Sequence, residues 1–155
     1  MRKPKIYIET TLFNYYFDKN RDAHADTVAL FKQIADGKYE AYASTHVTDE
    51  LNIALEPRRS QMLALIPQYG IHLLQTSDEA KKLAEIYVAE GIIPQPHIVD
   101  AFHIAIATVH DLGMIASLNF RHIVKHKTKL TTEKINIMNG YRPVVIVSPM
   151  EIVHT

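Results

Sequence analysis

The sequence predicts a single α/β domain with a mostly parallel five-stranded sheet and helices on both faces. Short apolar segments rich in β-branched residues alternate with segments of helical periodicity, as they do in βαβ units. The 155 residues suit one domain, and no repeat or linker-like stretch divides them, so we expect one domain over residues 1–155. Folds of this class bind ligands beyond the carboxyl ends of the strands, so the polar residues at those ends are the first candidates for a site.

The N-terminal part of the chain begins this alternation. Residues 5–9 (KIYIE) predict the first strand. Residues 26–36 have apolar side chains at helical spacing, and Gly37 follows as a stop signal. Residues 39–44 (YEAYAS) predict the second strand. These elements form a first β-α-β crossover, which we expect to be right-handed.

The middle of the chain predicts two helices and a strand. Ser44 or Thr45 can cap a helix that extends to Pro57. Residues 60–67 predict a further short helix, and residues 71–75 (IHLLQ) predict the third strand.

The C-terminal part predicts two helices and two strands. Residues 78–90 repeat apolar side chains on one face, which is typical of an amphipathic helix. Residues 96–110 (PHIVDAFHIAIATVH) predict a helix that is apolar nearly all round and therefore buried. Residues 114–118 and 144–148 predict the fourth and fifth strands.

The composition excludes several classes of protein. The 17 basic residues balance the 17 acidic ones, so any nucleic-acid contact has to come from a local basic patch. The absence of cysteine excludes disulfide scaffolds, thiolate metal sites and thiol enzymes. The five glycines never cluster, which removes support for phosphate-binding and dinucleotide-binding loops and for a serine nucleophile elbow. With no signal peptide and no apolar run of about 18 residues, we expect a cytoplasmic protein without a membrane partner.

Four polar residues fall where strands end or helices begin. Glu9 ends the first strand, and Glu50 lies one turn into the helix after the second. Asp100 lies in the first turn of its buried helix, and Asn119 ends the fourth strand. Because the carboxyl ends of parallel strands meet at one edge of the sheet, we expect these four side chains to lie together.

The mutual repulsion of three carboxylates at one edge of the sheet has to be offset by another interaction. Two carboxylates about 4 Å apart repel by about 4 kcal/mol at an effective dielectric constant of 20. A raised pKa, a basic partner or a divalent cation relieves such repulsion, and Asp100 alone is equally explained by the dipole of its helix. If a cation binds, an oxygen-only site favours Mg²⁺ or Mn²⁺ over Zn²⁺. Such an ion can polarise a phosphodiester and activate water.

Several segments resemble motifs of the PIN-domain ribonucleases. Residues 6–11 (IYIETT) resemble the opening strand of that family, and residues 100–107 (DAFHIAIA) resemble its Asp-Ala-x-His-Ile-Ala-x-Ala helix. Residues 118–123 (LNFRHI) resemble its Thr-x-Asp/Asn-Phe-x-His segment, and Glu50 fits its mid-chain glutamate. The order and spacing match over residues 5–148.

This resemblance implies a PIN-like three-layer α/β/α sandwich and an endoribonuclease that depends on Mg²⁺ or Mn²⁺. Most bacterial and archaeal members of this size are VapC-like toxins of toxin–antitoxin pairs. The resemblance therefore also implies an RNA substrate, a cognate antitoxin, a type II system and a homodimer.

The same resemblance implies roles for the candidate residues. Glu9 and Asp100 become the primary metal ligands. Glu50 binds the ion through water or orients the attacking water, and Asn119 holds a water of the ion or a phosphate oxygen. Thr10 hydrogen-bonds a ligand carboxylate or a phosphate, unless it is an ordinary turn hydroxyl.

Two residues depart from the family pattern. Glu9 replaces the usual aspartate and adds one methylene to a metal ligand, and Asn119 stands where many members have a fourth acid. Three carboxylates still suffice for one metal, but a second site is weakened. The alternative hypothesis is therefore a catalytically impaired PIN-like module that binds RNA or protein.

Basic and aromatic residues give less specific signals. Arg121 and Lys125 lie in a stretch without acids before Glu133 and either neutralise RNA phosphates or belong to a solvated loop or helix face. Tyr15 and Tyr16 either stack on bases or pack in the core.

The histidines raise the question of zinc. His122 and His126 have the spacing of zinc ligands on a helix, but no third ligand lies nearby in the sequence, which disfavours a zinc enzyme. His103, one turn after Asp100, is expected to pack or to hydrogen-bond locally.

Overall fold

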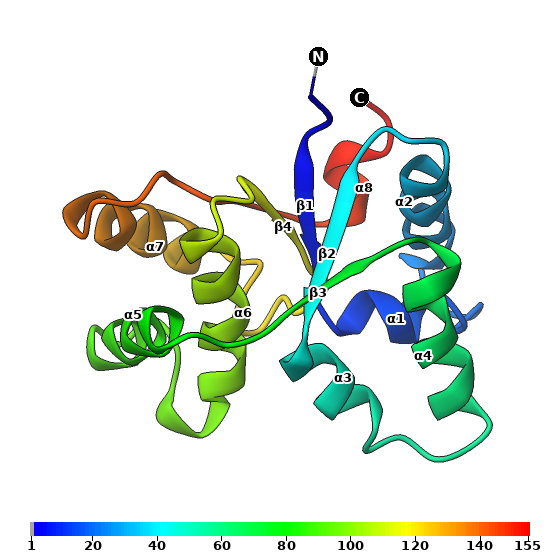
Figure 1. Cartoon of the computed structure of the whole chain (residues 1–155), viewed down its shortest axis with the longest axis horizontal. Helices are drawn as coiled ribbons and strands as arrows, with labels where there is room; N and C mark the ends of the chain where they lie inside the picture. Colours follow the sequence, from blue (N-terminus) through cyan, green and yellow to red (C-terminus); the bar gives the residue numbers. More distant parts are fainter. Residues whose placement is uncertain (1) are drawn as a thin grey trace.

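The computed structural model describes residues 2–155 and contains a five-stranded sheet with the order β3-β2-β1-β4-β5 (Figure 1). The strands are β1 (Lys5–Ile8), β2 (Glu40–Ser44), β3 (His72–Leu74), β4 (Met114–Ala116) and β5 (Val145–Val147). All four neighbouring pairs run parallel. The predicted α/β class with five strands is therefore confirmed, with each strand near its expected place.

Helices cover both faces of this sheet, as Figure 1 shows, and complete the expected three-layer α/β/α sandwich. One face has α5 (Asp78–Ala89), α6 (Ile98–Val109) and α7 (His126–Met138), and the other has α1 (Thr11–Tyr15), α2 (His24–Ala35), α4 (Arg58–Gln68) and α8 (Pro149–Ile152). The remaining helix, α3 (Thr45–Leu51), follows β2 and contacts both α4 and α6. A 3₁₀ turn, η1 (Gln95–His97), leads into α6. Within residues 2–155 no helix is both long and apolar enough to cross a membrane.

The central strand β1 forms the middle of the core. Ile6, Tyr7 and Ile8 are completely buried, because helices cover both faces of the strand. Such a strand has a continuous apolar sequence rather than an alternating one. The first charged side chain after this apolar run is Glu9, which follows β1 at the carboxyl end of the strand.

The helix after β2 begins as predicted but ends early. Ser44 is its N-cap, and the Ser44 Oγ accepts a hydrogen bond from the His46 backbone N–H at 3.2 Å. The expected extension to Pro57 is wrong, since α3 ends at Leu51. Beyond that residue Ile53 and Leu55 are 82% and 85% exposed, so no core contact holds further turns in a helix.

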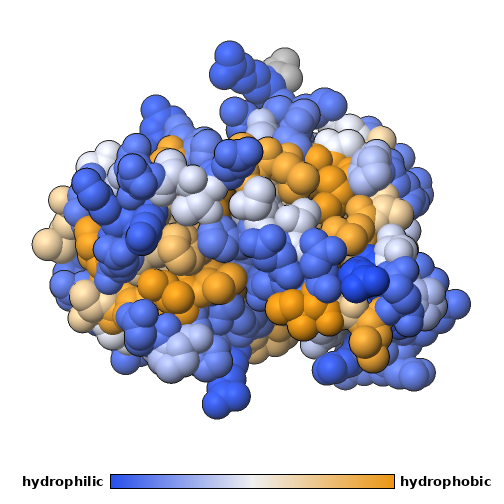
Figure 2. Space-filling model, turned by 60° about the horizontal axis from the view of Figure 1, so that its bottom comes forward, coloured by the Kyte–Doolittle hydropathy of each residue, from blue (hydrophilic) through white to orange (hydrophobic). Residues whose placement is uncertain are grey.

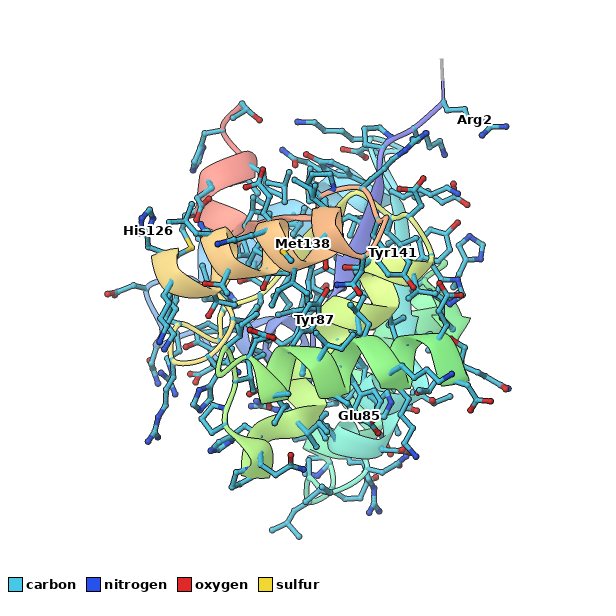
Figure 3. The ribbon with its side chains drawn as sticks, turned by 90° about the vertical axis from the view of Figure 1, so that its left-hand side faces the viewer. Arg2, Glu85, Tyr87, His126, Met138 and Tyr141 are labelled. Carbon is cyan, nitrogen blue, oxygen red and sulfur yellow. The ribbon has the colours of Figure 1, made fainter. Side chains whose placement is uncertain are left out.

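Three helices were not predicted from the sequence, namely α1, α7 and α8. Of these α7 is the longest, and its buried face is largely polar, including Thr128, Thr132 and Asn136. The Tyr87 hydroxyl of α5 donates to Asn136 Oδ1, and Asn136 Nδ2 donates to Thr108 Oγ1 of α6 at 3.1 Å. A hydrogen-bonded network thus joins α5, α6 and α7, with Tyr87 lying between α5 and α7 in Figure 3.

We expect Tyr87→Phe to lower the free energy of unfolding by about 1–3 kcal/mol, because it leaves the buried Asn136 Oδ1 without its donor. Tyr141→Phe is the matched control, since the Tyr141 hydroxyl donates to Glu79 in an exposed position. The control should change the stability by less than about 0.5 kcal/mol. Urea denaturation measures both variants, and equal losses would contradict this assignment.

Candidate active site

The carboxyl ends of the strands lie at one edge of the sheet, with α3 and the first turn of α6 beside them at the bottom of Figure 1. Glu9 follows β1 directly, and its backbone N–H donates to the Ala116 carbonyl of β4 at 3.1 Å. Figure 2 turns this part of the molecule toward the reader and shows hydrophilic side chains between hydrophobic patches.

The carboxylate of Glu9 is buried and held by two hydroxyls. Thr11 Oγ1 donates to Glu9 Oε1 at 2.5 Å, and Ser117 Oγ donates to the same oxygen at 2.7 Å. Burial raises the pKa of Glu9, while the charge of His103 and the two hydroxyls oppose this rise. One oxygen is therefore fixed by the protein, and Oε2 has no hydrogen-bonded side chain within residues 2–155.

Glu50, on α3, is also held through one oxygen. Glu50 Oε1 accepts hydrogen bonds from Thr10 Oγ1 at 2.6 Å and from His103 Nε2 at 2.7 Å. Burial acts to raise the pKa of Glu50, but the hydrogen bond and charge of His103, together with Thr10, outweigh burial and lower it. Glu50 is consequently the carboxylate of the group that stays ionised most readily.

His103 connects the site to the core. Its Nδ1 lies 2.6 Å from the Tyr7 hydroxyl, which lies 2.7 Å from Ser44 Oγ. Burial acts to lower the pKa of His103, but the Glu50 hydrogen bond and the charges of Glu9, Glu50 and Asp100 raise it overall. The carboxylates around the ring therefore favour its protonated form.

His103 packs in the interior, as expected, but its hydrogen bonds are not local, because its partners Tyr7 and Glu50 lie on other elements. Sequence reasoning missed its place in the site. The available signal was the spacing of Asp100 and His103, which puts an acid and a histidine on one face of a buried helix.

Asp100 and Asn119 complete the edge. Asp100 is partly buried in the first turn of α6, and burial raises its pKa. The charge of Glu50 adds to this rise, while His103, His122 and the Asn119 side chain oppose it. Asn119 Oδ1 accepts the His122 backbone N–H at 3.0 Å, which fixes the loop after β4.

The structure thus brings Glu9 and Glu50 to His103, while Asp100 lies near enough for its charge to act on His103 and has the Asn119 side chain as a hydrogen-bond partner. Donor atoms of Glu9, Glu50 and His103 lie within 4.8 Å of one another. Carboxylate and amide oxygens are donors that suit Mg²⁺ and Mn²⁺, so the residues present fit such an ion.

The other candidates lie around this edge. Thr10 is buried and bonds Glu50 rather than facing solvent. Arg121 and Lys125 are exposed, and both charges act on His122. Tyr16 packs in the core, with its ring centroid 5.0 Å from that of Phe31.

Tyr15 is half-buried, as Tyr16 is. It lines a surface cavity of about 280 Å³ together with Arg21 and the exposed Phe120. The guanidinium of Arg21 lies 5.1 Å from the centroid of the Tyr15 ring. Aromatic surface and a cation therefore lie together at this cavity.

Comparison with known proteins identifies the family. The PIN domain model matches residues 6–126. The Mycobacterium tuberculosis toxin VapC20, which cleaves the sarcin-ricin loop, is 13% identical, with a TM-score of 0.56 over 71% of this chain and 86% of that one. VapBC2 from Rickettsia felis, solved bound to a DNA fragment from its promoter, is 11% identical, with a TM-score of 0.57 over 93% of this chain and 98% of that one.

No curated protein matches this sequence. At these identities the two solved structures establish a shared fold. The family model spans most of the chain, including β1, Glu50 and the Asp100 helix. The sequence resemblance is confirmed, and the chain belongs to the PIN domain family.

Proposed function

We propose that this protein is a divalent-metal-dependent endoribonuclease and the toxin of a type II toxin–antitoxin system. The observation that supports this most strongly is the placement of Glu9 and Glu50 at the buried His103, with Asp100 near enough for its charge to act on that ring. Such a group keeps a net negative charge that a divalent ion can balance. The family and the nuclease activity of the structural neighbour VapC20 favour RNA as the substrate.

Each residue has a task in this reaction. Glu9 and Asp100 hold Mg²⁺ or Mn²⁺, which when bound supplies positive charge that polarises the phosphodiester and lowers the pKa of water. Glu50, kept ionised by His103, orients the attacking water through its free oxygen. The side chain of Asn119 donates a hydrogen bond to a phosphate oxygen, and its own Oδ1 is fixed by His122.

Substrate contacts extend from this centre. Arg121 and Lys125 are exposed next to the loop that holds Asn119 and neutralise phosphates on either side of the cleaved bond. Tyr15 and Phe120 offer aromatic surface on which an unpaired base can stack. We therefore favour single-stranded or looped RNA over duplex RNA.

The partners follow from the same proposal. VapBC2 is a structural neighbour over nearly the whole chain, which favours a cognate antitoxin and a cytoplasmic setting. Ile53 and Leu55, exposed after α3, are apolar side chains that a partner chain can cover. We also propose a homodimer, which sedimentation of the isolated chain can test.

The second candidate is an impaired module that binds RNA or protein without cutting it. Glu9 favours this candidate, because its longer side chain is already bonded to Thr11 and Ser117 through one oxygen. Asn119 also lowers the negative charge relative to members with a fourth acid.

We expect Asp100→Asn to lower the rate of RNA cleavage at least ~100-fold, because it removes one charge that holds the ion. The matched control is Asp49→Asn, which removes an exposed carboxylate beside Glu50 on α3 and should leave the rate unchanged. Cleavage of a labelled RNA pool in Mn²⁺ gives both rates. The nuclease proposal fails if Asp100→Asn cuts as fast as the wild type.

We expect chelation with EDTA to stop cleavage, and Mg²⁺ or Mn²⁺ to restore it. The physical reason is that the carboxylates repel one another and provide no positive charge for the phosphodiester. Cleavage that continues in EDTA would contradict metal dependence. RNA binding that is the same with and without metal, together with no cleavage in either ion, would support the impaired module instead.

A further inference from the structure

A second cluster, with different donor chemistry, adjoins the acidic site. Donor atoms of His97, Asp100 and His122 lie within 4.8 Å of one another. The ring centroids of His97 and His122 are 4.2 Å apart, with an interplanar angle of 31°. His97 ends η1, Asp100 lies in the first turn of α6, and His122 lies in the loop before α7. Two segments of the chain, the start of α6 and the loop that contains His122, therefore bring two imidazoles to one carboxylate.

His122 has a nitrogen that the protein leaves unsatisfied. The residue is only 9% exposed, and its Nε2 is buried without a hydrogen-bond partner within residues 2–155. Leaving a buried polar atom unpaired costs about 1–3 kcal/mol, so native structures almost always provide a partner. The unpaired Nε2 of a ring that lies beside His97 and Asp100 is therefore a second indication, besides the clustering, that a ligand binds here.

His122 is held in place by its backbone. Its N–H donates to Asn119 Oδ1 at 3.0 Å, and its carbonyl accepts Thr128 Oγ1 at 3.0 Å. Burial, followed by the charge of His97, lowers the pKa of His122. The exposed His97 can adjust its rotamer at little cost and so shorten the donor distances.

We propose that His97, Asp100 and His122 form a site for a divalent transition-metal ion of the class that prefers imidazole, with Zn²⁺ as its representative. Two imidazoles and one carboxylate suit Zn²⁺ and leave a fourth position for water or a substrate oxygen. Mg²⁺ prefers the all-oxygen group around Glu9 and Glu50. Asp100 has two carboxylate oxygens, so it is common to both sites.

Nearby positive charges do not prevent this binding. The charges of Arg121 and Lys125 act on His122, but both side chains are exposed and screened by solvent. Asp100 contributes a negative charge directly within the donor set. The proposed site does not require that the protein cleaves RNA, because it rests on His97 and His122, which have no task in the nuclease reaction.

The test is calorimetric titration of Zn²⁺ into the full-length chain after removal of any histidine tag. We expect one Zn²⁺ to bind, and His97→Ala and His122→Gln to weaken it about tenfold or more. His126→Ala is the control, because His126 is exposed at the start of α7 and points outward in Figure 3. Glu9→Gln alters only the acidic site and should also keep Zn²⁺ affinity.

A second measurement guards against variants that lose their fold. Zn²⁺ should raise the thermal midpoint of the wild type and of His126→Ala, but not that of His97→Ala, whose side chain is exposed. Wild-type affinity in His97→Ala would overturn the proposal. If Glu9→Gln weakens Zn²⁺ binding as much as His97→Ala does, the ion binds in the acidic site. That result would also overturn the proposal.

Discussion

The candidate site depends on one buried histidine, His103, that lies near three carboxylates. Bringing Glu9, Glu50 and Asp100 together is unfavourable in itself, and burial adds to the difficulty of keeping them ionised. His103 offsets part of this cost, because its ring is completely buried and its pKa is raised by the same acids.

The hydrogen bonds of His103 also join this charge to the fold. Through Tyr7 the ring reaches Ser44, and Ser44 is the residue that caps the helix carrying Glu50. The same ring bonds Glu50 directly. Hydrogen bonds thus connect Tyr7 of the middle strand to Ser44 at the start of α3, and to Glu50 on the same helix through His103. The position of Glu50 is set by the core rather than by solvent.

Much of this architecture could be predicted from the sequence, because strands and buried helices have apolar patterns that are local. The continuous apolar run of β1 and the apolar helix around Asp100 are examples. What could not be predicted depends on partners far along the chain. The buried face of α7 is polar, so no apolar periodicity marked it, and only Tyr87 and Thr108 explain why Asn136 is buried.

The pairing of the histidines also depends on contacts between distant parts of the chain, which the sequence pattern does not reveal. Helical spacing paired His122 with His126, but α7 begins at His126, and His122 lies in the loop before it. The neighbour of the His122 ring is instead His97, which the fold brings from the entrance to α6. Spacing identifies metal ligands only when both residues belong to one regular element. Here the pair is created by the tertiary structure.

One departure from the family pattern, Asn119, bears on the charge of the site. With Asn119 rather than an acid, this edge has three carboxylates, and a second ion would need donors that do not add negative charge. Neutral imidazoles are such donors, and His97 and His122 provide them beside Asp100. The proposed transition-metal site would therefore add an ion to this edge without another acid, provided that the two ions differ in the ligands they prefer.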